Sequence, residues 1–111
     1  VNDDPALGRM LAAMLGHEGH QVTVVASAEA ALERLARADY DVVVADLDLG
    51  PGLDGWDLAE RVRREWPDVR VCLVTGWGEH VDPIVAAERG VASILAKPYA
   101  LNELLAVIGT R

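Results

Sequence analysis

The sequence has little of several residue types that mark other classes of protein. Its 111 residues include one cysteine and no phenylalanine, and Lys97 is the only lysine among ten basic side chains. A single cysteine excludes a framework of disulfide bonds. No apolar run approaches the roughly 20 residues of a membrane-spanning helix, and no basic stretch before a short apolar core indicates a signal peptide. We therefore expect a cytoplasmic protein without a membrane segment.

Positive charge is also scarce. Eighteen acidic side chains against ten basic ones give a formal net charge of −8. An acidic surface repels phosphate backbones and anionic lipid, so neither nucleic acid nor a membrane is expected as the direct partner. The length supports a single domain over residues 1–111, which should bury roughly 65% of the surface that the unfolded chain exposes.

The chain instead alternates short valine-rich runs with helical patterns. The apolar runs predict strands over residues 22–25, 42–45, 69–74 and 94–96. Between and around them, apolar side chains recur at helical spacing, and the predicted helices begin at capping residues, which are Asp4, Ser27, Asp54 and Asp82. This alternation is typical of an α/β protein with a doubly wound parallel sheet.

The first residues predict the end of a further strand. The chain opens at Val1 with an acidic turn, and a helix follows immediately. The first strand is therefore expected to be truncated, and we expect upstream residues in the natural protein.

Polar side chains follow the predicted strands at their carboxyl ends. In an open parallel sheet these ends form the ligand site, near the point where the strand order reverses. Two carboxylates brought together there repel one another, and a hard divalent cation such as Mg²⁺ relieves that repulsion. A lysine and a threonine opposite the metal would complete a site for a tetrahedral dianion. The residues expected to converge are Asn2, Asp3, Asp46, Thr75 and Lys97.

Five short motifs occur in order along the chain. They are VNDDP at residues 1–5, DVVVAD at 41–46, LDG at 53–55, VTG at 74–76 and AKP at 96–98. Together they resemble the receiver domain of two-component response regulators, over essentially the whole chain. The resemblance implies a flavodoxin-like fold with a five-stranded parallel sheet in the order 2-1-3-4-5.

The resemblance also implies a role for each site residue. Asp46 would accept a phosphoryl group from a histidine kinase, from a histidine phosphotransfer domain or from a small acyl phosphate. Thr75 and Lys97 would each contact a phosphoryl oxygen, and the bond between Lys97 and Pro98 would be cis. Such a domain catalyses only its own phosphorylation and dephosphorylation. Movement of Thr75 would carry the signal to a face built from the fourth helix, the last strand and the last helix. The domain would self-associate or bind an output partner through this face.

The same resemblance implies a Mg²⁺ site. Asp3, Asp46 and the backbone carbonyl of Asp48 would bind the ion directly, whereas Asn2 would act through water. The sequence departs from the family here, because Asn2 occupies a position that is usually acidic. A weaker affinity for Mg²⁺ is therefore expected.

Two further departures concern the loop and the switch. The segment 46–55 is one residue longer than the commonest family pattern, and the extra turn contains Gly50, Pro51 and Gly52. Ile94 stands where many members carry a tyrosine or phenylalanine that moves with the threonine. We therefore expect the readout of phosphorylation to differ.

Other interpretations of the same residues remain open. A degenerate receiver could serve only for docking, and Asp46 followed by Leu47 and Asp48 superficially resembles an aspartyl-phosphate hydrolase of the haloacid dehalogenase type. Thr75 also has a plain explanation as a strand residue. Cys72 lies inside an apolar strand and is expected to be a buried apolar residue. The glycine-flanked Trp77 gates the site, contacts a partner or packs on the sheet edge.

Overall fold

The structure is a computed structural model, and it describes residues 1–111 except 3, 48, 50–51, 77–80, 98 and 109–111. The predictions for Asp3, Asp48, Trp77 and Pro98 lie outside the described residues. No helix in the described part of the chain is long and apolar enough to cross a membrane.

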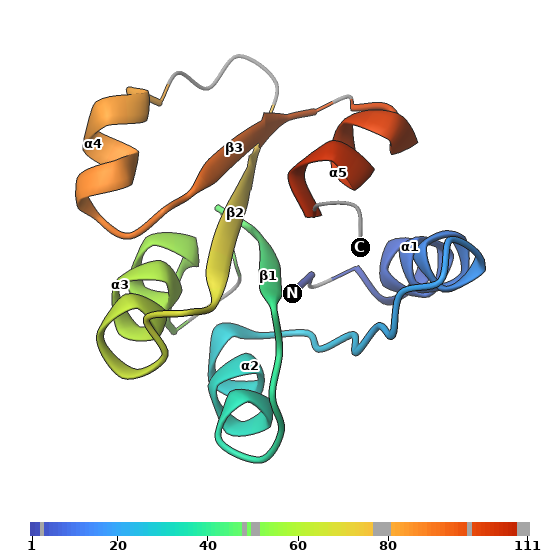
Figure 1. The fold of residues 1–111 in the computed structure, drawn as a ribbon, viewed down its shortest axis with the longest axis horizontal. Helices are drawn as coiled ribbons and strands as arrows, with labels where there is room; N and C mark the ends of the chain where they lie inside the picture. The colour runs from blue at the N-terminus through green and yellow to red at the C-terminus, as the bar shows by residue number, and fades with distance from the viewer. Residues whose placement is uncertain (3, 48, 50–51, 77–80, 98, 109–111) are drawn as a thin grey trace.

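Five helices and three strands alternate along the described chain (Figure 1). Their order is α1 (Pro5–His17), α2 (Ala28–Leu35), β1 (Val42–Asp46), α3 (Gly55–Glu65), β2 (Arg70–Thr75), α4 (Pro83–Glu88), β3 (Ser93–Ala96) and α5 (Leu101–Ile108). The predicted caps explain where the helices begin. Asp4, Ser27, Asp54 and Asp82 each accept a hydrogen bond from a backbone N–H of the first turn of α1, α2, α3 or α4.

The three strands form one parallel sheet in the order β1-β2-β3. Asp46 is in register with Val74, and Thr75 is in register with Ala96. Because the strands are parallel, their carboxyl ends meet at one edge of the sheet. This is the edge at which the sequence predicts the ligand site.

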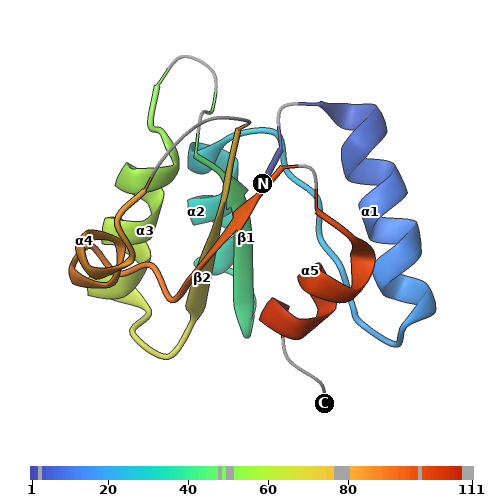
Figure 2. The same ribbon diagram turned by 90° about the horizontal axis from the view of Figure 1, so that it is seen from above.

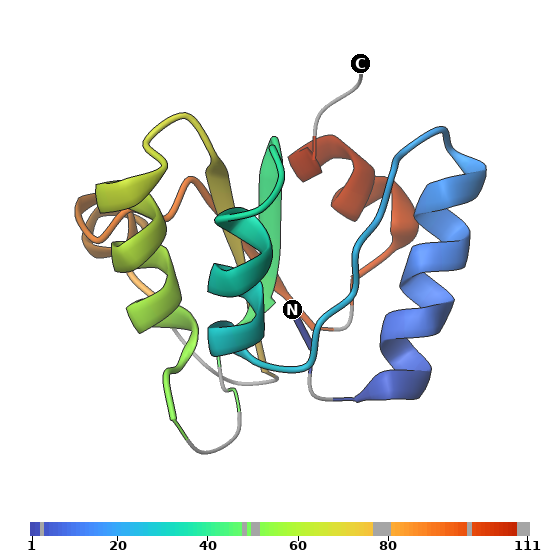
Figure 3. The ribbon, with the colours of Figure 1, turned by 90° about the horizontal axis from the view of Figure 1, so that it is seen from below.

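Helices cover both faces of the sheet (Figures 2 and 3). On one face, α2, α3 and α4 pack over a buried cluster that includes Leu58, Val71 and Leu73. On the other face, α1 and α5 lie over a smaller cluster that includes Cys72 and Leu104. Burial on both faces explains why the strand sequences are continuous apolar runs.

Within the described residues the sheet has three strands, whereas the sequence predicts five. Residues 21–25 run as an irregular segment, and Val22 and Val24 are exposed by 38% and 41%. Among the described residues, this segment is linked to the sheet through the first two residues of the chain: Asn2 N–H donates to the Val25 carbonyl at 3.0 Å, and Asp46 N–H donates to the Val1 carbonyl at 3.2 Å. A strand needs a ladder of such bonds along its neighbour, and Val1 and Asn2 provide too short a neighbour.

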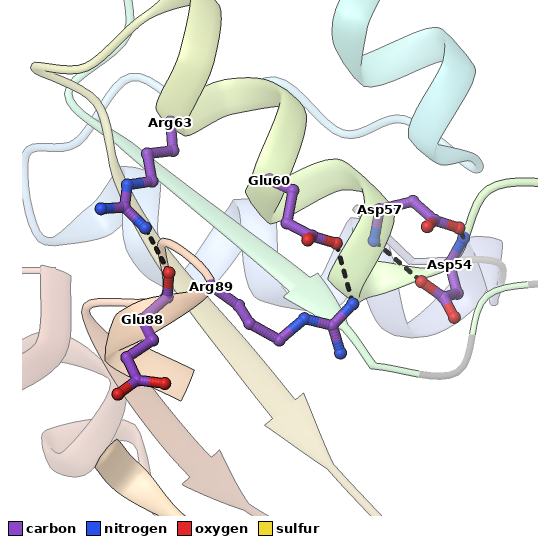
Figure 4. A network of polar contacts seen from close by, with 6 residues as sticks. All are labelled: Asp54, Asp57, Glu60, Arg63, Glu88 and Arg89. Atoms are coloured by element: carbon purple, nitrogen blue, oxygen red, sulfur yellow. Dashed lines mark hydrogen bonds and ion pairs between the residues drawn. The ribbon is translucent and has the colours of Figure 1, made fainter. Parts of the chain in front are cut away.

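Hydrogen bonds and an ion pair connect the carboxyl end of α4 to α3 (Figure 4). The Arg89 guanidinium lies 4.5 Å from the centre of the Trp56 ring and 2.8 Å from Glu60 Oε2. Arg63 donates a hydrogen bond to the backbone carbonyl of Glu88. At the first turn of α3, Asp54 and Asp57 complete a capping box.

Candidate functional site

Three of the predicted site residues converge at the carboxyl edge of the sheet. Asp46 is the last residue of β1, Thr75 is the last residue of β2, and Lys97 follows the last residue of β3. Backbone hydrogen bonds continue between these ends: Lys97 N–H donates to the Thr75 carbonyl at 3.0 Å, and Leu47 N–H donates to the Val74 carbonyl at 2.9 Å. The sheet itself therefore sets the spacing of the three residues.

Asp46 and Lys97 form an ion pair at this edge. Lys97 Nζ lies 3.4 Å from Asp46 Oδ1. The Asp46 side chain is 11% exposed, whereas the Lys97 side chain is 42% exposed. A side chain with so little access to solvent needs a polar or charged partner in the protein, and the Lys97 ammonium is such a partner. The arrangement presents one carboxylate to a ligand and keeps a cation beside it.

Thr75 and Tyr99 border this pair. Thr75 is only 2% exposed, and its backbone is held in the sheet by its register with Ala96 and by the hydrogen bond from Lys97 N–H. Burial raises the pKa of the Tyr99 hydroxyl, and the negative charge of Asp46 raises it further. Tyr99, Lys97 and Leu101 also line a largely apolar cavity of about 450 Å³ between α1 and α5.

The first turn of α3 lies directly on the backbone of Asp46. Gly55 N–H donates to the Leu47 carbonyl at 3.0 Å. A Cβ atom at Gly55 would lie 2.6 Å from the Asp46 carbonyl oxygen and 2.8 Å from Leu47 Cα. Real Cβ atoms do not approach backbone so closely, hence the absence of a side chain at Gly55 allows this contact.

Part of the predicted metal site falls within the described residues. Asp46 offers an anionic oxygen at the sheet edge, whereas Asp3 and Asp48 lie outside the described residues. The Asn2 side-chain oxygen accepts a hydrogen bond from Asp4 N–H at 2.7 Å, so it takes part in the turn before α1. Within the part of the chain that is described, no three His, Cys, Asp or Glu side chains are grouped to hold a metal ion.

Two other predicted residues lie within the sheet. Ile94 is in register with Leu73 and packs against the cluster beneath α2, α3 and α4. Cys72 is 1% exposed, as the sequence predicts, and burial raises the pKa of its thiol to about 11. Cys72 therefore serves the core as a small apolar side chain.

Sequence reasoning missed the contacts made by the segment between β1 and α3 and by Tyr99. The Glu29 carboxylate of α2 accepts a hydrogen bond from Leu53 N–H, 24 residues away. Tyr99 was likewise not assigned to the site. Local sequence signals do not identify a pair so far apart along the chain. Tyr99 lies only two residues after Lys97, and this proximity is the signal that indicates it as a residue of the site.

Comparison with known proteins places the chain among signalling domains. A family model described as the response regulator receiver domain matches residues 1–109. Transcriptional regulatory protein TcrA of Mycobacterium tuberculosis is 38% identical over 106 residues, which cover 96% of this chain and 42% of TcrA. Sensory transduction protein RegX3 of the same species is 38% identical over 108 residues, which cover 97% of this chain and 47% of RegX3. The chain thus spans less than half the length of these relatives.

Solved structures show the same fold. A response regulator receiver domain protein from Clostridium thermocellum superposes with a TM-score of 0.88 at 25% identity, covering 96% of this chain and 86% of that one. The BeF3-activated N-terminal receiver domain of RstA from Klebsiella pneumoniae gives a TM-score of 0.84 at 30% identity, covering 98% of this chain and 95% of that one.

Proposed function

Because this chain belongs to the response regulator receiver domain family, a family of signalling domains, we propose that Asp46 is its phosphoacceptor. The observation that carries the proposal is the ion pair between Asp46 Oδ1 and Lys97 Nζ at 3.4 Å. Asp46 is the mostly buried carboxylate at the carboxyl edge of the sheet, and the only lysine of the chain lies beside it.

The residues at this edge have complementary tasks in phosphoryl transfer. The Asp46 carboxylate would attack phosphorus in line and form an aspartyl phosphate, while the leaving group departs on the opposite side. The Lys97 ammonium would then pair with a phosphoryl oxygen, and the Thr75 hydroxyl would donate to another. The chain contributes position and charge, which are the main sources of rate in phosphoryl transfer. This reaction makes the domain a catalyst of its own modification only.

Mg²⁺ is the cofactor that we propose for this reaction. The donor chemistry fits, since a mostly buried carboxylate oxygen is a preferred ligand of this ion. Asp46 would hold it together with Asp3 and the Asp48 carbonyl, and the bound ion would neutralise charge on the phosphoryl oxygens. Asn2 would contribute through water only, and its bond to Asp4 N–H supports a weak contribution.

The partner that we propose is a histidine kinase or a histidine phosphotransfer domain. Phosphorylation would shift Thr75 and change the face formed by α4, β3 and α5. Ile94 offers no aromatic ring for that change, so the signal would be read differently from that of members with an aromatic residue there. We propose that residues 1–111 do not contact DNA directly. The proposal concerns these residues alone, because TcrA is named a transcriptional regulatory protein and is much longer than this chain.

We also propose that residues 1–111 form one domain whose full sheet has five strands in the order 2-1-3-4-5. Two hydrogen bonds support this order. Asp46 N–H donates to the Val1 carbonyl at 3.2 Å, and Asn2 N–H donates to the Val25 carbonyl at 3.0 Å. Residues 1–2 therefore lie between β1 and residues 21–25, which is the place between the second and third strands that the first strand takes in this order.

The test is phosphorylation of the purified domain by acetyl phosphate with Mg²⁺. Intact mass should increase by one phosphoryl group in the wild type and stay unchanged in Asp46→Ala. Beryllium fluoride with Mg²⁺ should perturb the amide spectra at the carboxyl edge of the sheet. A wild type that shows neither change is instead a docking module that works without phosphorylation. Turnover of a free phosphate ester would support the hydrolase alternative.

A further inference from the structure

Glu29 lies in the first turn of α2, but its carboxylate is bonded to the loop that follows Asp46. Leu53 N–H donates a hydrogen bond to Glu29 Oε2 at 3.2 Å. The two residues are 24 positions apart, so this contact is part of the tertiary structure and not of the helix cap. It joins α2 to the final residues of the loop between β1 and α3.

Gly52 allows this contact. Its φ of +105° lies in the left-handed region that favours glycine. A side chain at Gly52 would also collide with the Glu29 carboxylate, which lies over this residue. The backbone turn and the position of Glu29 thus depend on the same glycine.

The remaining anchors of the loop lie on other elements. Leu49 is 8% exposed and belongs to the same buried cluster as Ala28 of α2. Gly55 N–H is bonded to the Leu47 carbonyl, which ties the start of the loop to α3. Glu29 adds a polar contact at Leu53, which lies between Leu49 and Gly55 along the chain.

From these contacts we propose that Glu29 is a positioning residue for phosphoryl transfer. The inference rests on the proposed function of Asp46. The hydrogen bond to Glu29 restricts the backbone at Leu53, two residues before Gly55, and Gly55 lies against the Asp46 carbonyl and is bonded to the Leu47 carbonyl. A restricted backbone at Leu53 and Gly55 keeps the backbone beside Asp46 in place when Mg²⁺ and the phosphoryl donor bind. The role requires an acceptor oxygen at Glu29 and does not require its charge.

Two substitutions at Glu29 separate the oxygen from the charge. Glu29→Ala removes the acceptor, whereas Glu29→Gln retains an acceptor oxygen without the charge. The matched control is Glu33→Ala, since Glu33 lies on the same helix, is 65% exposed and pairs with Arg37, just beyond the end of α2, at 2.9 Å. For each variant, Mg²⁺ affinity is measured by calorimetry and the phosphorylation rate by intact mass with acetyl phosphate. Hydrogen exchange of the Leu53 amide reports on the loop itself.

We expect Glu29→Ala to weaken Mg²⁺ binding and to slow phosphorylation, each by about tenfold, which is the lower end of the effect of removing a group that orients the residues of a metal site. The Leu53 amide should also exchange faster. Glu29→Gln should remain within about twofold of the wild type, since the hydrogen bond is kept. Glu33→Ala should match the wild type in all three measurements.

Several outcomes would overturn the inference. If Glu29→Ala equals Glu33→Ala in Mg²⁺ affinity and rate, Glu29 has no positioning role, even though phosphorylation of Asp46 stands. If Glu29→Gln is as impaired as Glu29→Ala, the charge and not the oxygen matters. If the wild type neither binds Mg²⁺ nor accepts a phosphoryl group, the proposed function fails and the inference falls with it.

Discussion

Lys97 Nζ lies 3.4 Å from Asp46 Oδ1, although β1, which ends at Asp46, and β3, which precedes Lys97, are not neighbours in the sheet. β2 lies between β1 and β3, and adjacent strands are about 4.8 Å apart, so the two backbones are separated by roughly 10 Å. A long side chain is needed to cross the end of β2. Lysine has this length and carries a compact charge at its tip, which explains why the only lysine of the chain stands at this position.

The shape of this cation should matter as much as its charge. In Lys97→Arg, the guanidinium is planar and forked where the site accommodates a single ammonium. We expect phosphorylation by acetyl phosphate to be at least about tenfold slower, because electrostatic groups act through exact placement. The thermal midpoint should change little, since Lys97 is 42% exposed. A variant with the full rate of the wild type would contradict the proposed role of Lys97.

Gly55 should be intolerant of a side chain although it begins a helix. In Gly55→Ala, the added Cβ would meet backbone atoms of Asp46 and Leu47. Overpacking of this kind costs about 1–3 kcal/mol in the free energy of unfolding, which exceeds the gain in helix propensity. Urea denaturation measures the difference. Gly16→Ala in α1 is the control, because nothing lies within 4 Å of its added Cβ, and it should leave stability equal or higher. Equal stability of the two variants would contradict the close contact at Gly55.

Stability should fall at alkaline pH partly because of Cys72. Burial raises the pKa of its thiol from 9.0 to about 11 in the folded protein. Below pH 9 the thiol is neutral in both states, and its contribution is fully present. Between about pH 9 and 11 the unfolded chain loses the proton first, so folding becomes less favourable by up to about 2–3 kcal/mol.

The comparison is with Cys72→Ala, which should show a smaller loss of stability over this pH range in chemical denaturation. Burial and the charge of Asp46 raise the pKa of Tyr99 in both proteins and so cancel in the difference, whereas the smaller effect of the Cys72 charge on Tyr99 is lost together with the thiol. Parallel pH profiles of wild type and Cys72→Ala would show that the thiol does not titrate as described.

The contact between Arg89 and Trp56 should stabilise the junction of α3 and α4. Arg89→Ala removes the cation over the ring and the pair with Glu60, and should lower the free energy of unfolding by about 1 kcal/mol. Arg61→Ala removes an exposed pair with Glu65 within α3 and should cost less than about 0.5 kcal/mol. The loss of stability, measured by urea denaturation at the same ionic strength, should be larger for Arg89→Ala than for Arg61→Ala. Equal losses would show that the contacts of Arg89 do not stabilise the junction of α3 and α4.

Local signals predicted most of this fold. Capping residues such as Asp54 and Asp82 act on the adjacent N–H groups, so sequence alone located the helix starts. The convergence of Asp46, Thr75 and Lys97 also followed from the sequence, since parallel strands must end at one edge. The five-strand sheet did not appear in full, because a strand over residues 22–25 depends on a neighbour that Val1 and Asn2 only begin to form.

Contacts between distant elements could not be predicted in this way. Trp56 and Arg89 are 33 positions apart, and Glu29 and Leu53 are 24 apart; their meeting depends on how α2, α3 and α4 pack on the sheet. A tryptophan or a glutamate near the start of a helix carries no local signal for its tertiary partner. Such pairs become visible only when the helices are placed.

The most direct test of the central claim is to locate the phosphoryl group on the chain. The domain is treated with acetyl phosphate and Mg²⁺, the acyl phosphate is reduced with borohydride, and the peptides are sequenced by mass spectrometry. Asp46 should be converted to homoserine, and treatment without acetyl phosphate should leave it unchanged. Conversion at another aspartate, or at none while the fold is intact, would contradict the account.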